Sequence, residues 1–264
     1  MKKNEKKAIN KKGKSRRSFL ELALTGTAAV SALSLGLTKD LYAAPSGPIV
    51  IGHQCELTGG FSSWGYWHDK CAKAAVKIIN EGGGIAGRKV ELATEDTESN
   101  PAAGSRKLRS LIERRKASFV VGSVHSGIML ASIPIATELK TPYFSAGEAT
   151  EATGSKGSRY SFRTGTDTYA LAAAGAPWAY KNLGKTWTMI FPDYAWGHSH
   201  YQEHKKIIEK MGGKVNPPIA VPLGTKDLLP YLSKIPENTE VLFSVFFGAL
   251  SVAFFTQQKS MRLD

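Results

Sequence analysis

The alternation of short apolar runs with longer amphipathic stretches, which begins at residue 49, constrains the fold of this chain most strongly. Residues 49–52 are an apolar run of the length and composition of a strand. The next stretch carries apolar residues at the i, i+3, i+4, i+7 spacing of one helix face, namely Ala72, Ala75, Val76 and Ile79. Strictly alternating strands and helices predict an α/β fold, in which helices cover both faces of a parallel sheet.

The same pattern continues along the rest of the sequence. Glycines at 82–84 stop the first helix, and Asn100 followed by Pro101 is an N-cap with proline at the first helical position. Further strands or extended segments are expected at residues 89–96, 118–122, 142–145, 160–164, 186–191, 214–221 and 240–247. Further helices are expected at residues 128–139, 168–182, 198–211, 226–235 and 249–261. In such sheets, ligands bind beyond the carboxyl ends of the strands.

The N-terminus has the features of an export signal. Residues 1–44 hold ten Lys or Arg and three acidic residues, and the sequence S-R-R-S-F-L at residues 15–20 precedes a weakly apolar stretch. This pattern is similar to a twin-arginine signal peptide, with Glu21 as a departure from it, and predicts a periplasmic protein cleaved after Ala43 or Ala44. The alternative of a membrane anchor is disfavoured because Glu21, Gly26 and several hydroxyl residues interrupt the stretch.

The charge and the cysteines exclude several classes of function. The chain carries a net charge of +13, but more than half of it lies in residues 1–44 and the rest is scattered, so nucleic-acid binding is not expected. The two cysteines, Cys55 and Cys71, are too few for a disulfide scaffold or a four-cysteine zinc site, and the sequence leaves their pairing open.

Two motifs match known signatures but stand in the wrong context. Residues 82–87 fit G-x-G-x-x-G, yet a helix is expected before them and a strand after them, so they are interpreted as a helix stop and turn. His200, Glu203 and His204 fit the H-x-x-E-H pattern of a zinc hydrolase, but no third ligand stands out downstream. We interpret these histidines and His198 as solvated or edge residues of an amphipathic helix, and keep an exported zinc hydrolase as a distant alternative. No cofactor is expected.

Two loops that follow strands combine small residues, hydroxyls and backbone N–H groups. Residues 123–127 lead into a helix, and residues 145–150 follow the next strand, so both lie at the carboxyl edge of the sheet. Hydroxyls and N–H groups at a helix N-terminus suit a carboxylate. Ordinary helix capping needs the same residue types, and both interpretations stay open.

The chain from about Pro48 to Asp264 resembles the type I periplasmic solute-binding proteins that serve branched-chain amino-acid ABC transporters. The most specific match is residues 79–92, which fit I-N-x-x-G-G-I-x-G-R-K-V, followed by Asp96 and Pro101. Residues 57–65 resemble the first ligand-side loop of the family, residues 162–164 its first crossover between lobes, and residues 193–197 the Tyr-Gly turn of the second lobe.

The resemblance implies a site for a small solute between two lobes. Ser126 and the backbone of Gly127 would hold the carboxylate of the solute, and the shell would be completed by Ser145, Gly147 and Ala149 or Thr150. The walls of the pocket would be Trp64, Trp196 and Phe247, for which core packing is the alternative.

The resemblance also implies domains, partners and function. We expect a signal peptide at residues 1–44, an N-terminal lobe at 45–165 and an incomplete C-terminal lobe at 166–264, because members of the family are longer. The implied protein is a monomer without enzymatic activity, exported by the twin-arginine translocase, that delivers a branched-chain or related amino acid to an ABC permease. Urea, an amide or an aromatic acid as solute, and a ligand-sensing module on the same fold, remain alternatives.

Overall fold

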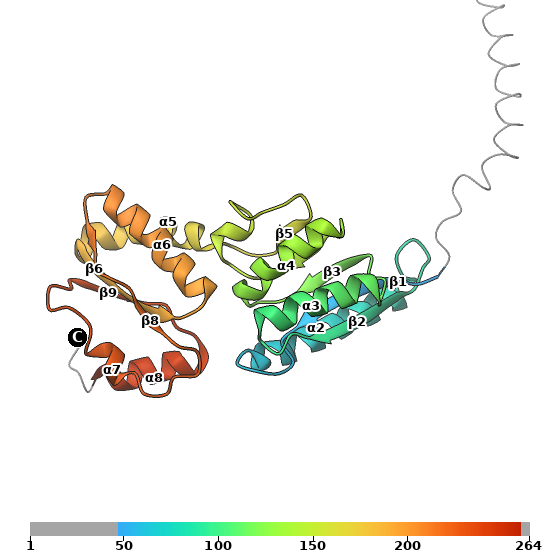
Figure 1. Ribbon diagram of the computed structural model, residues 1–264, viewed down its shortest axis with the longest axis horizontal. Coiled ribbons are helices and arrows are strands. Elements are labelled where there is room, and N and C mark those ends of the chain that lie inside the picture. Colours follow the sequence, from blue (N-terminus) through green and yellow to red (C-terminus); the bar gives the residue numbers. More distant parts are fainter. Residues whose placement is uncertain (1–46, 260–264) are drawn as a thin grey trace, which may run out of the picture. The chain divides into compact units, whose positions relative to one another are not determined.

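The structure, a computed structural model, describes residues 47–259, and its first part is a five-stranded parallel sheet with the order β2-β1-β3-β4-β5 (Figure 1). The strands are β1 (Ile49–Cys55), β2 (Val90–Asp96), β3 (Phe119–Gly122), β4 (Tyr143–Ser145) and β5 (Ser161–Arg163). The helical elements are α2 (Ser62–Glu81), α3 (Pro101–Glu113), α4 (Ser126–Glu138) and the short 3-10 helix η1 (Thr150–Ala152). The expected alternation of strands and helices is therefore confirmed.

The second part is a four-stranded sheet in which β6 is central (Figure 1). β6 pairs in parallel with β7 and β8 along one edge and with β9 along the other. Its strands are β6 (Thr186–Pro192), β7 (Lys214–Val215), β8 (Ile219–Val221) and β9 (Val241–Ser244). Its helices are α5 (Thr168–Asn182), α6 (Ala195–Lys210), α7 (Leu229–Leu232) and α8 (Gly248–Gln258).

Helices cover both faces of each sheet, as the sequence predicts. In β1, Gly52 faces Leu111 of α3, while the next residue, His53, lies with His68 of α2 on the opposite face. In β6, Met189 belongs to a core cluster with α5 and α6, while Ile190 packs in a separate cluster with α7 and α8. Successive strand residues point to opposite faces, so each sheet packs against helices on both faces.

Two sequence signals at helix ends act as expected. The Asn100 side chain accepts a 3.0 Å hydrogen bond from the Ala103 N–H, and Pro101 occupies the first turn of α3. The glycine run at 82–84 ends α2 and turns into β2, so it is not a dinucleotide-binding loop. Gly84 has a φ of 80°, and a Cβ there would lie 2.0 Å from the Arg88 carbonyl oxygen, so only glycine fits this position.

Three expectations about the secondary structure are wrong. The single strand expected at residues 214–221 is two short strands, because Pro217 and Pro218 lack the N–H groups that a continuous ladder needs. The helix expected at 226–235 is reduced to α7, Leu229–Leu232. The predicted inner face of α2 is only partly buried, and Ala75 is exposed.

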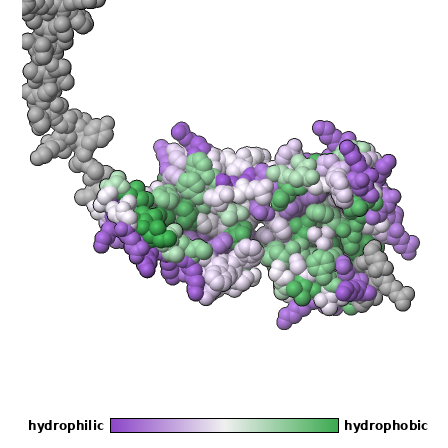
Figure 2. Space-filling model, turned by 180° about the vertical axis from the view of Figure 1, so that it is seen from behind, coloured by the Kyte–Doolittle hydropathy of each residue, from purple (hydrophilic) through white to green (hydrophobic). Residues whose placement is uncertain are grey.

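Aromatic side chains reach the surface at the β4–β5 side of the first sheet. The rings of Phe144 and Phe162 stack with their centroids 4.8 Å apart, and Phe162 is 42% exposed. Figure 2 shows hydrophobic surface over the part of the molecule that holds this sheet. Within residues 47–259, this side of the sheet is therefore only partly covered.

The described residues from Pro48 onward belong to one compact unit. The expected signal peptide, its twin-arginine motif and its cleavage site lie outside the described residues. The expected boundary at residues 165 and 166 falls in the connection between β5 and α5 and stays a prediction. Among the described residues, no helix combines the length and apolar character needed to cross a bilayer.

Candidate functional site

A largely aromatic cavity of about 190 Å³ lies where loops from both sheets meet. The first sheet contributes Phe61 and Trp64 after β1, Val124 after β3 and Glu148 after β4, and the second contributes Tyr194 and Trp196 after β6 and Phe247 after β9. All these segments follow the carboxyl ends of parallel strands, which is where open α/β sheets bind ligands.

The rings of the cavity contact one another across the two sheets. The Phe61 ring lies 5.6 Å from the Tyr194 ring and 5.2 Å from the Phe247 ring, measured between centroids. The Trp196 ring lies 5.7 Å from the Phe247 ring. The structure thus brings the predicted wall residues Trp64, Trp196 and Phe247 together at one cavity.

Among the lining residues within 47–259, Glu148 is the only one with a charged side chain. Its Oε2 accepts a 2.7 Å hydrogen bond from the Trp196 Nε1–H, which joins a loop of the first sheet to α6 of the second. Its backbone N–H donates to the Ser126 Oγ at 3.1 Å, and its backbone carbonyl accepts from the Thr168 N–H at 2.9 Å. Both its side chain and its backbone are therefore held in place.

The groups predicted to hold a carboxylate at the start of α4 bind other parts of the protein. The Gly127 and Ile128 N–H groups donate to the His125 Nδ1 at 3.0 and 3.3 Å. The Ser126 Oγ accepts hydrogen bonds from the Glu148 and Ala149 N–H groups. Because Nδ1 accepts, the His125 ring is neutral, and burial lowers its pKa to about 4. In this structure, these residues follow the capping interpretation.

The second predicted loop is also fixed by internal bonds. The Ser145 Oγ donates to the Ser123 carbonyl at 2.8 Å and accepts from the Gly147 N–H at 3.1 Å. Ser145 and Ala149 are buried, and neither lines the cavity. These residues shape the loop that presents Glu148.

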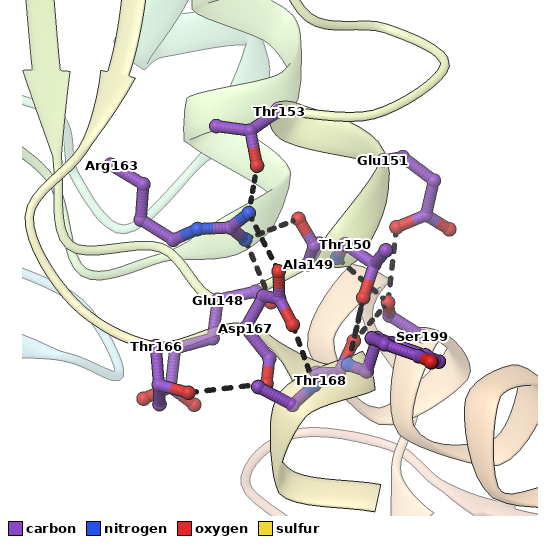
Figure 3. A network of polar contacts seen from close by, with 12 residues as sticks. Glu148, Ala149, Thr150, Glu151, Thr153, Arg163, Thr166, Asp167, Thr168 and Ser199 are labelled. Atoms are coloured by element: carbon purple, nitrogen blue, oxygen red, sulfur yellow. Dashed lines mark hydrogen bonds and ion pairs between the residues drawn. The ribbon is translucent and has the colours of Figure 1, made fainter. Parts of the chain in front are cut away.

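Thr150, also predicted in the carboxylate shell, instead belongs to a polar network that joins the two parts (Figure 3). Its hydroxyl lies 2.8 Å from the Thr168 hydroxyl, which in turn lies 2.6 Å from the Ser199 hydroxyl of α6. The Thr150 N–H donates to the Ser199 Oγ at 3.1 Å, and Ser199 donates to Glu151.

Arg163 anchors the other side of this network (Figure 3). Its guanidinium forms a 3.1 Å ion pair with Asp167 and donates to the backbone carbonyls of Glu148 and Ala149. It also contacts the Thr153 hydroxyl. The Arg163 side chain is only 6% exposed, so water does not replace these partners.

The expectation that His200 and His204 are solvated is wrong, because both are buried. Neither ring nitrogen of His200 has a hydrogen-bond partner, its ring meets the Trp196 ring edge-on at 4.8 Å, and burial lowers its pKa to about 3. Glu203 pairs with Lys206. Residues 47–259 contain no group of three or more His, Cys, Asp or Glu that could hold a metal ion. Residues 47–259 therefore offer no candidate metal centre for the zinc-hydrolase alternative.

Four further residues line the cavity that were not among the predicted site residues, namely Phe61, Val124, Glu148 and Tyr194. Glu148 lies within the segment 145–150 that follows β4, so its place after that strand was the available signal. Both cysteines are free thiols, and burial raises the pKa of Cys55 to about 12.

Residues 48–264 match the family model described as periplasmic binding protein, and the chain belongs to this family. The family and its structural neighbours are solute-binding proteins rather than enzymes. The Leu/Ile/Val-binding protein homolog 3 of Brucella melitensis is 28% identical over 225 residues, which are 83% of this chain and 59% of that protein.

Two solved structures show the same fold. A periplasmic binding protein from Burkholderia mallei superimposes with a TM-score of 0.75 at 24% identity, over 82% of this chain and 58% of that one. A solute-binding protein of an ABC transporter from Rhodopseudomonas palustris, in complex with 3,4-dihydroxybenzoic acid, gives a TM-score of 0.69 at 25% identity, over 80% and 59% of the two chains. The present chain thus spans less than two thirds of these relatives.

Proposed function

We propose that this chain is the solute-capturing part of a substrate-binding protein of an ABC importer. The observation that carries the proposal is the aromatic cavity between loops that follow the carboxyl ends of two parallel sheets. A solute that contacts both sets of loops binds most tightly to the conformation in which both sets reach it. This difference in affinity shifts the population toward that conformation, which a membrane permease can recognise.

The proposed solute is small and carries a carboxylate, with a branched-chain or related amino acid as the first choice. The similarity to a Leu/Ile/Val-binding protein homolog supports this choice. The start of α4 at Ser126 supports it as well, because a helix N-terminus favours an anion. The His125 Nδ1 now accepts from the N–H groups there, so a carboxylate oxygen would take the place of that ring nitrogen.

An aromatic acid is the second candidate. The aromatic rings that line the cavity favour it, and a similar protein from Rhodopseudomonas palustris binds 3,4-dihydroxybenzoic acid. Titration calorimetry of the purified chain with leucine, isoleucine, valine, benzoate, 3,4-dihydroxybenzoate and urea separates these solutes. Binding of one class at a single site supports the proposal, and no binding of any of them contradicts it.

We further propose that the protein works as a monomer in the periplasm and is exported by the twin-arginine translocase. The support is S-R-R-S-F-L at residues 15–20 and the match to a periplasmic family. Replacing Arg16 and Arg17 by lysine should leave the precursor in the cytoplasm of a host that has this translocase. Periplasmic protein at the unchanged level in that variant would contradict the export route.

A further inference from the structure

The cavity contains one carboxylate and several aromatic faces, and this combination is selective for positive charge. Among the lining residues that the structure describes, Glu148 is the only acid, and there is no lysine, arginine or histidine. Aromatic faces attract cations through the ring quadrupole, and a nearby carboxylate adds direct attraction.

The charged groups behind the cavity wall leave Glu148 uncompensated. Arg163 approaches the Glu148 backbone, but its charge is paired with Asp167. The His125 ring contacts the rings of Phe61 and Tyr194 at a tilt, and it is neutral because its Nδ1 accepts hydrogen bonds from two N–H groups. Burial and the charge of Glu148 raise the pKa of Tyr194, so this phenol stays neutral as well.

One oxygen of Glu148 is available to a solute. The Trp196 Nε1–H holds Oε2 at 2.7 Å, whereas no hydrogen bond to Oε1 occurs within residues 47–259. The same hydrogen bond fixes the indole ring of Trp196 beside those of Tyr194 and Phe247, at 6.1 and 5.7 Å between centroids. The carboxylate and the ring faces are therefore arranged before any solute arrives, which reduces the ordering cost of binding.

We propose that Glu148 binds an ammonium group of the solute, which lies against the rings of Tyr194, Trp196 and Phe247. This inference rests on the proposed function and deepens it. The solute class is an organic ammonium with an apolar body, either an amine or an amino acid, rather than an acid whose only charge is a carboxylate. The cavity has a volume of about 190 Å³, which limits the solute to a small molecule.

Three probes of one carbon skeleton test the charge preference. Leucine carries both charged groups, 3-methylbutan-1-amine lacks its carboxylate, and 4-methylpentanoate lacks its ammonium. Titration calorimetry on the purified chain should detect binding of leucine and of the amine, with the acid at least about tenfold weaker. Equal or tighter binding of the acid would overturn the proposal and leave the solute-binding function intact. No binding of any probe would overturn both.

The variant Glu148→Gln tests the residue itself. Glutamine keeps an oxygen that can accept the Trp196 N–H, so the hydrogen bond between the two parts is preserved. We expect binding of the amine to weaken by about tenfold or more and binding of 4-methylpentanoate to be unchanged or stronger. Glu138→Gln is the matched control, because it removes the same charge at an exposed pair with Arg109. Equal amine affinity in Glu148→Gln and Glu138→Gln would overturn the assignment.

Discussion

The indole N–H of Trp196 donates a 2.7 Å hydrogen bond to the carboxylate of Glu148, although 48 residues separate the two in sequence. Glu148 follows β4 of the first sheet, and Trp196 lies in the first turn of α6, after β6 of the second. This bond joins the two sets of loops at the cavity and orients the side chain of Glu148, the one charged lining residue in the described part of the chain.

Replacing Trp196 by phenylalanine removes the N–H donor and keeps an aromatic ring. Glu148 then loses its partner across the cavity, and we expect the free energy of unfolding to fall by about 1–2 kcal/mol. Urea denaturation measures this difference. Trp178→Phe is the control, since Trp178 lies on α5 and is 62% exposed. An equal effect of both substitutions would contradict the role of the hydrogen bond.

Stability should fall as the pH is lowered from about 7 to 4. The buried rings of His53 and His125 have pKa values lowered from 6.5 to about 4, and that of His200 is lowered to about 3. As the pH falls, these histidines bind protons in the unfolded chain before they do so in the folded chain. Their contribution to the free energy of unfolding is therefore complete above pH 6.5 and is lost as the pH falls to the pKa of the folded state. The loss is roughly 3 kcal/mol for a ring such as His125.

His200→Phe should flatten this decline. The His200 ring nitrogens have no hydrogen-bond partner, and Trp196 lies against the ring, so an apolar ring suits the position. We expect unfolding at pH 5 to require more denaturant in His200→Phe than in the unchanged chain. His198→Gln, at an exposed histidine of the same helix, serves as the comparison. If the two variants show the same pH profile, burial of His200 does not control it.

Arg163→Met should destabilise the junction between the two parts. The substitution removes the ion pair of Asp167 and the Arg163 donor to the Ala149 carbonyl, while the Glu148 carbonyl keeps its hydrogen bond from the Thr168 N–H. The expected loss is about 2–4 kcal/mol. Chemical denaturation of Arg163→Met and of Arg159→Met, at an exposed arginine, measures it. A loss below that of Arg159→Met would show that the network does not stabilise the junction.

Gly65→Ala tests how α2 positions the first wall of the cavity. An added Cβ would lie 1.9 Å from the Glu56 carbonyl oxygen, so the start of α2, with Phe61 and Trp64, has to move away from the end of β1. We expect a loss of about 3 kcal/mol and weaker solute binding. Gly60→Ala is the control, because no atom lies within 4 Å of a Cβ there. A stable Gly65→Ala chain with unchanged affinity would contradict this dependence.

Much of the fold could be predicted because its signals are local. The apolar runs of β1 and β6, the Asn100-Pro101 helix start and the glycine turn before β2 each act within a few residues. The wall residues Trp64, Trp196 and Phe247 could be proposed from the resemblance to the family, and in the structure each follows the carboxyl end of a strand. The strand expected at 214–221 is wrong because apolar composition was weighed above Pro217 and Pro218, whose missing N–H groups already indicate a break.

The sequence by itself determined the alternation of strands and helices and the family. It also determined which segments follow the carboxyl ends of the strands, where a ligand can bind. Only the tertiary structure decided which donors at that edge are already taken. Gly127 and Ser126 have the right chemistry for a carboxylate, but His125 and the backbone of residues 148 and 149 occupy them. Hydrogen bonds saturate, so the availability of a donor depends on neighbours that the chain brings from far away, as with Glu148 and Trp196.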